Sequence, residues 1–336
     1  MTGTPSAPPP DAPAPDAPAP DAPAPVAVAG AGSIGVAFAI VFARAGHTVR
    51  VWDPFPASLE RARGDLADRL ERLAAHGLAG DPAATGARVV FTDDLAEAVA
   101  GAALVQECAP ERADVKRDLI LRAARSAPQR AVFASSSSAI RPGLLAEGLP
   151  GTVRERVLVG HPGNPPYLIP VIEVVPSPAT AGWAAERARA LYAGAGLRPV
   201  TVRHEPEGFV FNRLQGAVLR EAYCLLRDGV ATADEIDEVV RSGLGRRWSL
   251  IGPFETADLN SRGGLAAHAR TMGPAYARMG AERGQDDPWT EDLVSDAVAQ
   301  RRALLPLERW EERVRWRDER LMRLTPLWEE GRDGAS

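Results

Sequence analysis

The stretch VAVAGAGSIGVAFAIVFARAGHTVRVWD, residues 26–53, decides the fold of this chain. A short apolar run leads into closely spaced glycines, and a run rich in Ala, Phe and Ile follows. Ala45 and Gly46 are expected to end this helix, because glycine readily adopts the left-handed conformation found after helices. The run TVRVW then has the character of a strand. The stretch therefore predicts a strand, a helix and a second strand in one βαβ unit.

The glycines of this unit form GAGSIG, residues 30–35, which fits the pattern G-x-G-x-x-G. In that pattern Gly30 permits a tight turn, Gly32 lets a pyrophosphate approach the backbone, and Gly35 lets helix and strand pack closely. The free N–H groups and the dipole at the start of the helix favour the phosphates. The position between a strand and a helix makes this match more specific than the glycines alone.

Asp53 ends the second strand, where a carboxylate accepts hydrogen bonds from the adenosine ribose. The same negative charge repels a 2′-phosphate, so the sequence predicts NAD as the cofactor in preference to NADP. The residues expected to contact NAD in this unit are Gly30, Gly32, Ser33, Ile34, Gly35 and Asp53.

Apolar runs recur after the first unit, with helical segments between most of them. Residues 56–78 have the spacing of an amphipathic helix, with Leu59, Leu66, Leu70 and Leu73 on one side. Further strands are expected in ARVVF (87–91), ALVQE (103–107), RAVFAS (130–135), RVLVG (156–160) and VIEVV (171–175). Strands that alternate with helices predict a mostly parallel sheet covered on both faces, as in a Rossmann-like α/β domain.

The pattern changes near residue 208. Residues 209–229 have helical periodicity that ends at Gly229, and Thr232 with Glu235 predicts a capping box for the next helix. No convincing strand pattern follows, so this part of the chain is expected to be all α.

Three segments follow from these patterns. Residues 1–25 contain DAPAP three times and are predicted to be a disordered Pro/Ala-rich tail. Residues 26–205 are predicted to form the NAD-binding Rossmann domain. Residues 206–330 are predicted to form a helical C-terminal domain for substrate binding and dimerisation.

The composition excludes several classes of protein. The chain has 336 residues and is 45% hydrophobic, enough for two domains with apolar cores. The net charge is −5, and the tail carries three of the acids, so the remainder lacks the basic face typical of a nucleic-acid binder. The absence of a long apolar run and of a signal-peptide pattern predicts a cytoplasmic protein without a membrane span. Cys108 and Cys224 are expected to be buried free thiols.

The stretch HPGNPPYLIPVIEVVP, residues 161–176, places a histidine after a strand and before a group of prolines. Hydride transfer from a secondary alcohol to NAD needs a base, and histidine suits this task because its ordinary pKa lies near neutrality. Glu173 lies in an apolar run, and a buried carboxylate needs a partner. His161 and Glu173 are therefore predicted to form a base and its orienting carboxylate. The remaining histidines, which lie in no such pattern, are interpreted as structural: His47, His76, His204 and His268.

This stretch and EGFVFNRLQGAVLREAY (207–223) resemble the 3-hydroxyacyl-CoA dehydrogenase superfamily. GLGRRWSLIGPFETADLN (243–260) and WRDERLMRL (316–324) are similar to its L-gulonate 3-dehydrogenase and lambda-crystallin branch. The resemblance implies NAD-dependent oxidation of a 3-hydroxy acid to the 3-keto acid, with His161 and Glu173 as the catalytic pair.

The resemblance also assigns residues around the reacting group. FASSSSAI (133–140) matches the segment that places a serine near the nicotinamide, which gives Ser138, with Ser137 as the alternative. Asn212 matches an asparagine that donates to the substrate oxygen. Asn164 matches a residue near the nicotinamide and the substrate.

QECAPERADVK (106–116) resembles the segment that surrounds the nicotinamide ribose. Glu111 and Lys116, the only lysine of the chain, match the residues that the family uses there. A structural role for Glu107 stays open. No cluster of His, Cys or Asp has metal-ligand spacing, and no metal is expected.

The resemblance leaves two substrates open, a free 3-hydroxy acid such as L-gulonate and a 3-hydroxyacyl-CoA. Acyl-CoA members use a lysine in the helical hairpin after the second strand, which weakens the CoA alternative because residues 56–86 contain none. The arginines found there instead, interpreted as a solvated helix face, are Arg61, Arg63, Arg69 and Arg72.

Arg247 matches an arginine of the gulonate branch and would pair with a free substrate carboxylate. Gly163, Trp248 and Ser249 depart from the valine, tyrosine and alanine of that branch, which indicates a shifted substrate preference. A third alternative is a crystallin-like structural or NAD-binding protein without catalysis.

A homodimer through the helical domain is also implied. The residues that could form its interface, or else the core of that domain, are Leu293, Val294, Val298, Leu304, Leu305, Leu307, Trp310, Leu321 and Leu324.

Overall fold

The computed structural model describes residues 23–285, 290–313 and 316, so most of the predicted tail and the residues Leu321 and Leu324 lie outside it. Contacts divide the chain into two compact units, Met1–Val218 and Leu219–Ser336. The division falls inside helix α9 (Phe211–Arg227), because hydrogen bonds to Glu173 attach the start of this helix to the first unit.

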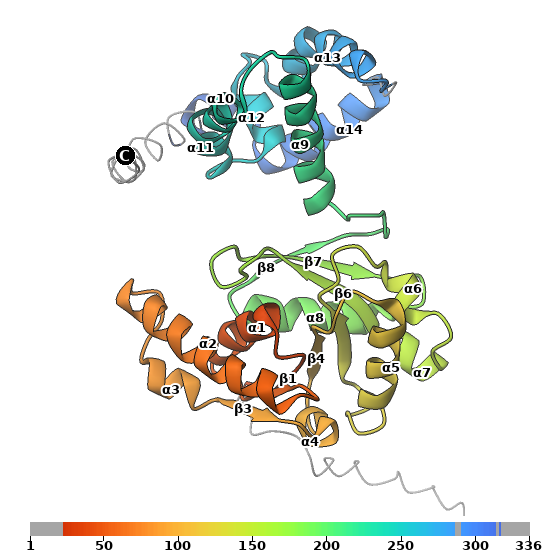
Figure 1. The fold of residues 1–336 in the computed structure, drawn as a ribbon. Coiled ribbons are helices and arrows are strands. Elements are labelled where there is room, and N and C mark those ends of the chain that lie inside the picture. Colours follow the sequence, from red (N-terminus) through yellow and green to blue (C-terminus); the bar gives the residue numbers. More distant parts are fainter. Residues whose placement is uncertain (1–22, 286–289, 314–315, 317–336) are drawn as a thin grey trace, which may run out of the picture. The chain divides into compact units, whose positions relative to one another are not determined.

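An eight-stranded sheet forms the centre of the first unit, in the order β3-β2-β1-β4-β5-β6-β7-β8 (Figure 1). Every neighbouring pair is parallel except β6 and β7, which confirms the mostly parallel sheet. The strands are β1 (Val26–Ala29), β2 (Val49–Trp52), β3 (Val89–Thr92), β4 (Leu104–Glu107), β5 (Val132–Ser135), β6 (Val157–Pro162), β7 (Val171–Pro176) and β8 (Arg198–Thr201). The strand order reverses between β1 and β4, and such a switch point is where open α/β sheets bind ligands.

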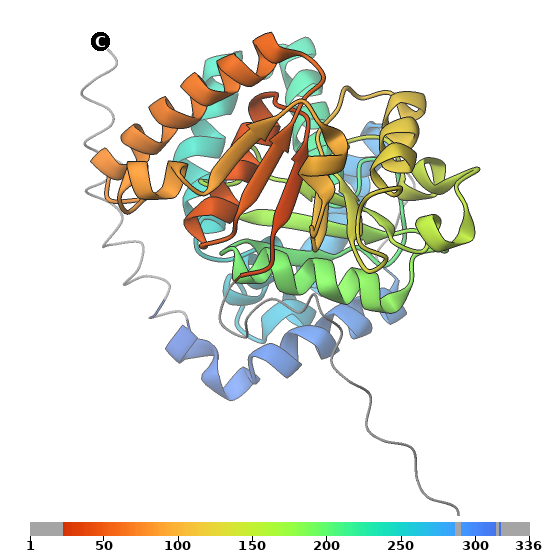
Figure 2. The same cartoon turned by 90° about the horizontal axis from the view of Figure 1, so that it is seen from below.

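Helices cover both faces of this sheet (Figure 2). They are α1 (Ser33–Arg44), α2 (Pro56–Ala75), α3 (Pro82–Gly86), α4 (Leu95–Val99), α5 (Ala113–Ala123), α6 (Pro142–Ala146), α7 (Gly151–Arg154) and α8 (Gly182–Gly194). Val26 and Val28 of β1 face the core under α1, α2 and α8. Ala27 and Ala29 face a second core under α4, α5 and α6.

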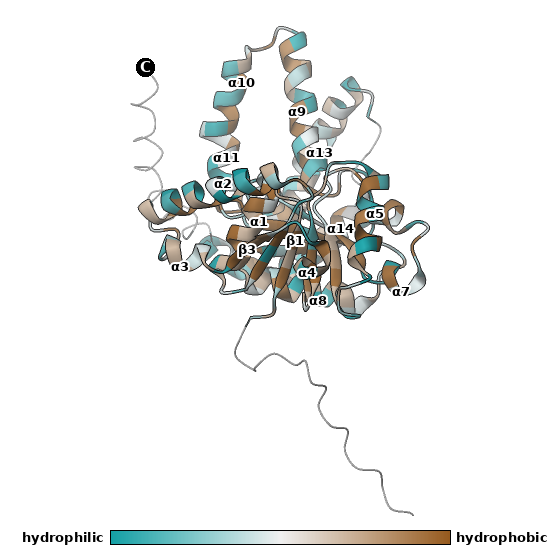
Figure 3. Cartoon of the chain, turned by 60° about the horizontal axis from the view of Figure 1, so that its bottom comes forward, coloured by the Kyte–Doolittle hydropathy of each residue, from teal (hydrophilic) through white to brown (hydrophobic). Residues whose placement is uncertain are grey.

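Helix α1 is the most deeply buried helix of the α/β unit. Residues 35–43 are all buried, and Phe38 and Phe42 are 0% exposed. Burial of each such side chain stabilises the fold by about 1.5–3 kcal/mol. Helix α2 buries only one side, through the four predicted leucines and Ala62, and its outer side is hydrophilic (Figure 3).

Two features of the sheet differ from the sequence prediction. Strand β6 continues through His161 and Pro162, so the histidine lies within the strand and not after it. Strand β8 was not predicted, because its sequence RPVT is mostly exposed and contains Pro199. Proline is tolerated in such an edge strand, since part of the edge makes no ladder hydrogen bonds.

The second unit is helical, and its described residues contain no strand. Its helices beyond α9 are α10 (Ala233–Val239), the π-helix η1 (Val240–Leu244), α11 (Gly245–Trp248), α12 (Pro253–Leu259), α13 (Gly264–Glu282), α14 (Glu291–Leu304) and the 3-10 helix η2 (Leu307–Arg309). The capping box of Thr232 and Glu235 is present at the start of α10, as predicted. Across the described residues, no helix has the length and apolar character that crossing a membrane requires.

Candidate active site

The glycine turn between β1 and α1 is tightly packed at Gly30 and Gly35 and open at Gly32. Gly30 has φ +121°, and a Cβ atom there would lie 2.6 Å from the carbonyl oxygen of Cys108. A Cβ atom on Gly35 would lie 1.9 Å from the carbonyl oxygen of Gly30. Nothing lies within 4 Å of the corresponding point on Gly32, the N-cap of α1, which makes no side-chain cap hydrogen bond. The N–H groups at this helix start are therefore available to an anion.

Asp53 lies beside this turn and holds it in place. Its Oδ2 atom accepts a hydrogen bond from the N–H of Ala31, and its Oδ1 atom accepts one from the N–H of Phe55, both at 3.0 Å. Each carboxylate oxygen has a second lone pair, which can accept from a ribose hydroxyl. Asp53 also lines a cleft of about 870 Å³ that the glycine turn borders, a volume in the range of cofactor pockets. The residues present thus fit a dinucleotide.

Arg69 of α2 differs from the solvated face predicted for it. Its guanidinium donates to the carbonyl oxygen and to the hydroxyl of Ser33, both at 3.0 Å. Ser33 is the first residue of α1. Arg69, which also pairs with Asp65 at 3.3 Å, therefore brings its guanidinium to the helix start at which phosphates would bind. Sequence spacing could not show this contact, because the two residues lie on different helices.

His161 and Glu173 lie opposite each other on the antiparallel strands β6 and β7. The Nδ1 atom of His161 is 2.7 Å from the Oε2 atom of Glu173, and both side chains are buried. The carboxylate can only accept, so in the neutral imidazole Nδ1 carries the proton and Nε2 keeps a free lone pair. The rings of Phe209 and Phe211 flank the imidazole, with centroids 5.7 and 6.2 Å away.

The other oxygen of Glu173 holds the start of α9. Oε1 accepts hydrogen bonds from the N–H groups of Val210, at 2.7 Å, and Phe211, at 3.0 Å. The side chain of Asn212, the next residue, donates to the carbonyl oxygen of Ser138 at 3.2 Å. Glu173 therefore connects the histidine to the helix that carries Asn212. The structure thus brings four predicted residues together within the first unit.

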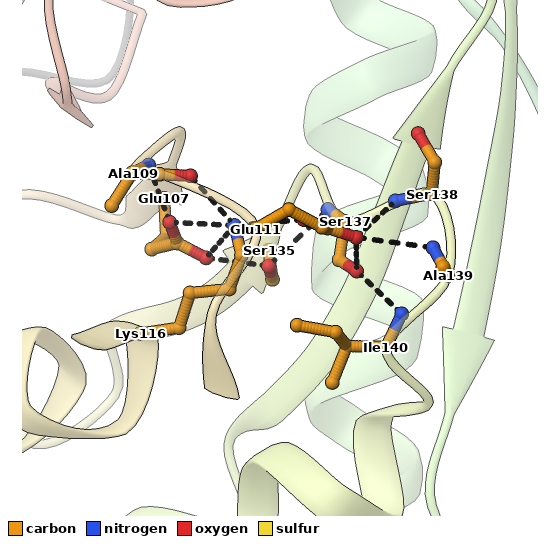
Figure 4. Close-up of polar contacts among 9 residues, drawn as sticks. All are labelled: Glu107, Ala109, Glu111, Lys116, Ser135, Ser137, Ser138, Ala139 and Ile140. Atoms are coloured by element: carbon orange, nitrogen blue, oxygen red, sulfur yellow. Dashed lines mark hydrogen bonds and ion pairs between the residues drawn. The ribbon is translucent and has the colours of Figure 1, made fainter. Parts of the chain in front are cut away.

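Glu111 and Lys116 belong to a network that joins the segments after β4 and β5 (Figure 4). The Oε1 atom of Glu111 accepts from the hydroxyl of Ser137 at 2.5 Å and from the N–H groups of Ser138 and Ala139 at 3.1 Å. Burial acts to raise the pKa of Glu111, but the Ser137 hydrogen bond and the Lys116 charge outweigh it, so the pKa is lowered. The alternative serine, Ser137, is thus occupied by Glu111.

Asn164 and Arg247 are the remaining predicted residues. Asn164 is exposed in the segment after β6 and is joined to Pro165 by a cis peptide bond. Arg247 lies half-buried on α11 of the second unit, and no hydrogen bond or ion pair joins its side chain to another described residue. The packing around Gly163 explains why glycine replaces the valine of the gulonate branch. A Cβ atom at this position would lie 2.5 Å from Cγ2 of Ile169.

The cysteines are free, as predicted, but only partly buried. Cys108 lines the cleft, and burial together with the charge of Glu107 raises the pKa of its thiol to about 12. Among the described residues, no three His, Cys, Asp or Glu side chains are grouped closely enough to hold a metal ion.

The fold and these residues together define a dinucleotide-dependent oxidoreductase. Two family models cover most of the chain: the 3-hydroxyacyl-CoA dehydrogenase NAD-binding domain matches residues 25–205, and the C-terminal domain of the same family matches residues 208–304. The chain belongs to the 3-hydroxyacyl-CoA dehydrogenase family and is an NAD-dependent enzyme of that family.

Individual relatives agree with this assignment. The lambda-crystallin homolog of Bos taurus is 36% identical over 89% of this chain and 94% of its own length. The L-carnitine dehydrogenase of Streptomyces griseus is 41% identical over 78% of this chain and 74% of its own. Among solved structures, the NAD+-dependent 5-formyl-3-hydroxy-2-methylpyridine 4-carboxylic acid 5-dehydrogenase is similar, with a TM-score of 0.67, 30% identity, and coverage of 84% of this chain and 97% of the other.

Proposed function

We propose that this protein oxidises a free 3-hydroxy acid to the 3-keto acid with NAD+, and that His161 is the general base. The observation that carries the proposal is the buried hydrogen bond of 2.7 Å between His161 and Glu173. This contact places the proton of the neutral imidazole on Nδ1 and leaves Nε2 as the acceptor, which is the tautomer required to take a proton from a hydroxyl group.

Four residues of the site have separate roles in the proposed reaction. Nε2 of His161 removes the hydroxyl proton, and Glu173 stabilises the imidazolium that results. NAD+, when bound, would supply the acceptor for the hydride from the carbon that bears this hydroxyl group. One N–H of the Asn212 amide binds the Ser138 carbonyl oxygen, so the second N–H is available to the substrate oxygen. Ser138 is the second expected contact of that oxygen.

The cofactor preference follows from Asp53. Both of its oxygens are already fixed by backbone N–H groups, so the carboxylate cannot easily rotate away from a 2′-phosphate. Its charge then disfavours NADP, while the remaining lone pairs suit the two ribose hydroxyls of NAD. The glycine turn and the N–H groups of α1 would hold the pyrophosphate.

The substrate class rests on the relatives and on Arg247. L-Carnitine is a 3-hydroxy acid with a free carboxylate, and a dehydrogenase named for it shares 41% identity with this chain. The guanidinium of Arg247, which has no partner among the described residues, suits a free carboxylate. L-Gulonate, the substrate of the branch that the sequence resembles, is a second acid of this class.

The test is a panel of substrates with full-length protein and NAD+, followed by the absorbance of NADH. L-Carnitine, L-gulonate, 3-hydroxybutyrate and 3-hydroxybutyryl-CoA separate the free acids from the CoA ester. Turnover of a free acid at a kcat/KM well above that of the ester supports the proposal. Preference for the ester refutes the substrate class, and silence with all four favours a crystallin-like role without catalysis.

We also propose that the protein is a homodimer through its helical unit. Leu305 is buried and Trp310 partly buried in a core with Ile251 and Leu259, so these two candidates pack within the unit. Helix α9 instead exposes Leu219, Tyr223 and Leu226 on one face, by 51%, 66% and 45%. Such an apolar stripe is typical of an interface between subunits. A cytoplasmic location stays a prediction.

A further inference from the structure

A buried ion pair lies where β4 ends (Figure 4). The residues that follow β4, Cys108 and Ala109, line the cofactor cleft. The side chains of Lys116, from α5, and Glu107, the last residue of β4, are each 1% exposed. The Nζ atom of Lys116 donates to both carboxylate oxygens of Glu107, at 3.0 and 3.1 Å, and to the carbonyl oxygen of Ala109 at 2.9 Å. Buried pairs of this kind often add little stability, because both groups lose their hydration. A role in placing other groups would explain the pair better.

Glu107 connects three segments of the chain. It is the direct neighbour of Ser135 across β4 and β5, and the Ser135 hydroxyl donates to its Oε2 atom at 2.5 Å. The N–H of Ala109 donates to its Oε1 atom at 2.5 Å. Burial raises the pKa of Glu107, and the charge of Lys116 opposes this shift. Without Lys116 the carboxylate would have no opposite charge at this depth.

Lys116 connects Glu107 to Glu111. Its Nζ atom lies 3.4 Å from the Oε2 atom of Glu111, whose Oε1 atom binds the hydroxyl of Ser137 and the N–H groups of Ser138 and Ala139. The ammonium group thus donates hydrogen bonds to Glu107 and Ala109 and also forms an ion pair with Glu111. Glu111, in contrast, is 44% exposed, so its Oε2 atom can also accept from a ligand.

We propose that Glu107 is a positioning residue that fixes Lys116 and, through Lys116 and Glu111, places Ser138 for the reaction. The inference rests on the function proposed above for Ser138 and Glu111. It assigns the buried part of the network, Glu107 and Ser135, a role in the geometry of the site. Glu111 is then the member of the network that meets the nicotinamide ribose, and Lys116 acts by holding it.

The first experiment replaces Glu107 by glutamine in the full-length protein. Glu107→Gln keeps the shape of the side chain but removes the buried one of the two carboxylates that pair with Lys116, so that only Glu111 still does. We expect kcat/KM to fall by about 10- to 100-fold, because small displacements of positioned groups have effects of this size. We also expect weaker NADH binding, measured by nucleotide fluorescence. A value of either quantity within twofold of the wild type would overturn the proposal.

A double variant separates positioning from mere stability. Glu107→Leu/Lys116→Met replaces the pair by apolar side chains, and such replacements often restore or increase stability. Positioning predicts that the melting temperature recovers while kcat/KM stays low. Recovery of both would show that the pair only stabilises the fold and would overturn the proposal. Ser135→Ala removes a single hydrogen bond to Glu107, so it should fold and show a smaller change of the same sign.

Arg156→Gln provides the matched control. Arg156 is buried and donates to the carbonyl oxygens of Thr152 and Pro128, at the opposite end of the strands. Its replacement should lower the melting temperature and leave kcat/KM unchanged. NADH binding needs no substrate, so it tests Glu107 even if the wild-type protein oxidises none of the panel. Unchanged NADH binding in Glu107→Gln contradicts this inference, whereas an inactive wild type contradicts only the proposed function.

Discussion

Glu173 lies directly opposite His161 on the neighbouring antiparallel strand, and its Oε2 atom is 2.7 Å from the Nδ1 atom of the imidazole. A pair of strands fixes this distance more rigidly than a loop would, because the ladder hydrogen bonds hold both backbones. The second oxygen of Glu173 holds the N–H groups that begin α9. One carboxylate thus orients the proposed base and the helix that carries Asn212.

This double role makes Glu173→Gln informative. A glutamine has one acceptor oxygen, so it cannot satisfy both the imidazole N–H and the helix N–H groups. We expect kcat to fall by about 10²–10⁴-fold, as for other altered base and orienter pairs. The melting temperature should also fall, since leaving buried N–H groups without an acceptor costs about 1–3 kcal/mol. His161→Ala should show the same loss of turnover with NADH binding retained, and near-normal turnover in it would refute the base.

The charge of Asp53 should set the cofactor preference. Asp53→Ala removes the ribose acceptor and the repulsion of a 2′-phosphate. We therefore expect kcat/KM with NAD+ to fall, and the ratio of kcat/KM with NADP+ to kcat/KM with NAD+ to rise. The ratio of the two kcat/KM values is the measurement. Asp68→Ala, at an exposed ion pair with Arg72, is the control and should leave the ratio unchanged. An unchanged ratio in Asp53→Ala would show that another residue selects the cofactor.

Arg69 should strengthen cofactor binding through its contact with Ser33. Arg69→Ala removes a positive charge and two hydrogen bonds from the start of α1, so the Kd of NADH should rise by about threefold to tenfold. The matched control is Arg72→Ala on the same helix, whose guanidinium is 77% exposed and pairs with Asp68 at the surface. An equal Kd of NADH in the two variants would show that Arg69 does not contribute to cofactor binding, as the sequence interpretation of a solvated helix face implies.

The raised pKa of Cys108 predicts a thiol that reacts slowly with electrophiles, and a stability of the fold that depends on pH. The folded protein holds this proton to about pH 12, whereas the ordinary thiol pKa is 9.0. The protonated thiol therefore adds to the free energy of unfolding in full below about pH 9. This stabilisation is lost as the pH rises towards 12, and about 1 kcal/mol of it is lost by pH 10. Cys108→Ala should lose less stability between pH 8 and pH 10 than the wild type, as measured by thermal unfolding. An equal loss in both proteins would contradict the shift.

The sequence predicts the parts of this protein in which local pattern and long-range structure agree. The first βαβ unit, the buried side of α2 and the capping box at Thr232 are all visible as periodicity or as short motifs. The pairing of His161 with Glu173 could also be inferred, because a carboxylate in an apolar run needs a partner.

Other features depend on contacts that no local pattern contains. The bond between Glu107 and Ser135 joins two strands, and that between Arg69 and Ser33 joins two helices. The second role of Glu173 depends on the N–H group of Val210, which lies 37 residues further along the sequence. Strand β8 itself is exposed, so it lacks the apolar signal by which the other strands were found.

The exposed face of α9 should control the oligomeric state. A charge in the centre of an apolar interface is costly to bury, so Tyr223→Glu should convert the proposed dimer to a monomer. Sedimentation or light scattering gives the mass directly. Leu78→Glu places the same charge at another exposed apolar position, 47% exposed after α2, and should leave the mass unchanged. If the wild type is already a monomer of 35.7 kDa, or if Tyr223→Glu stays a dimer, this face of α9 is not the interface.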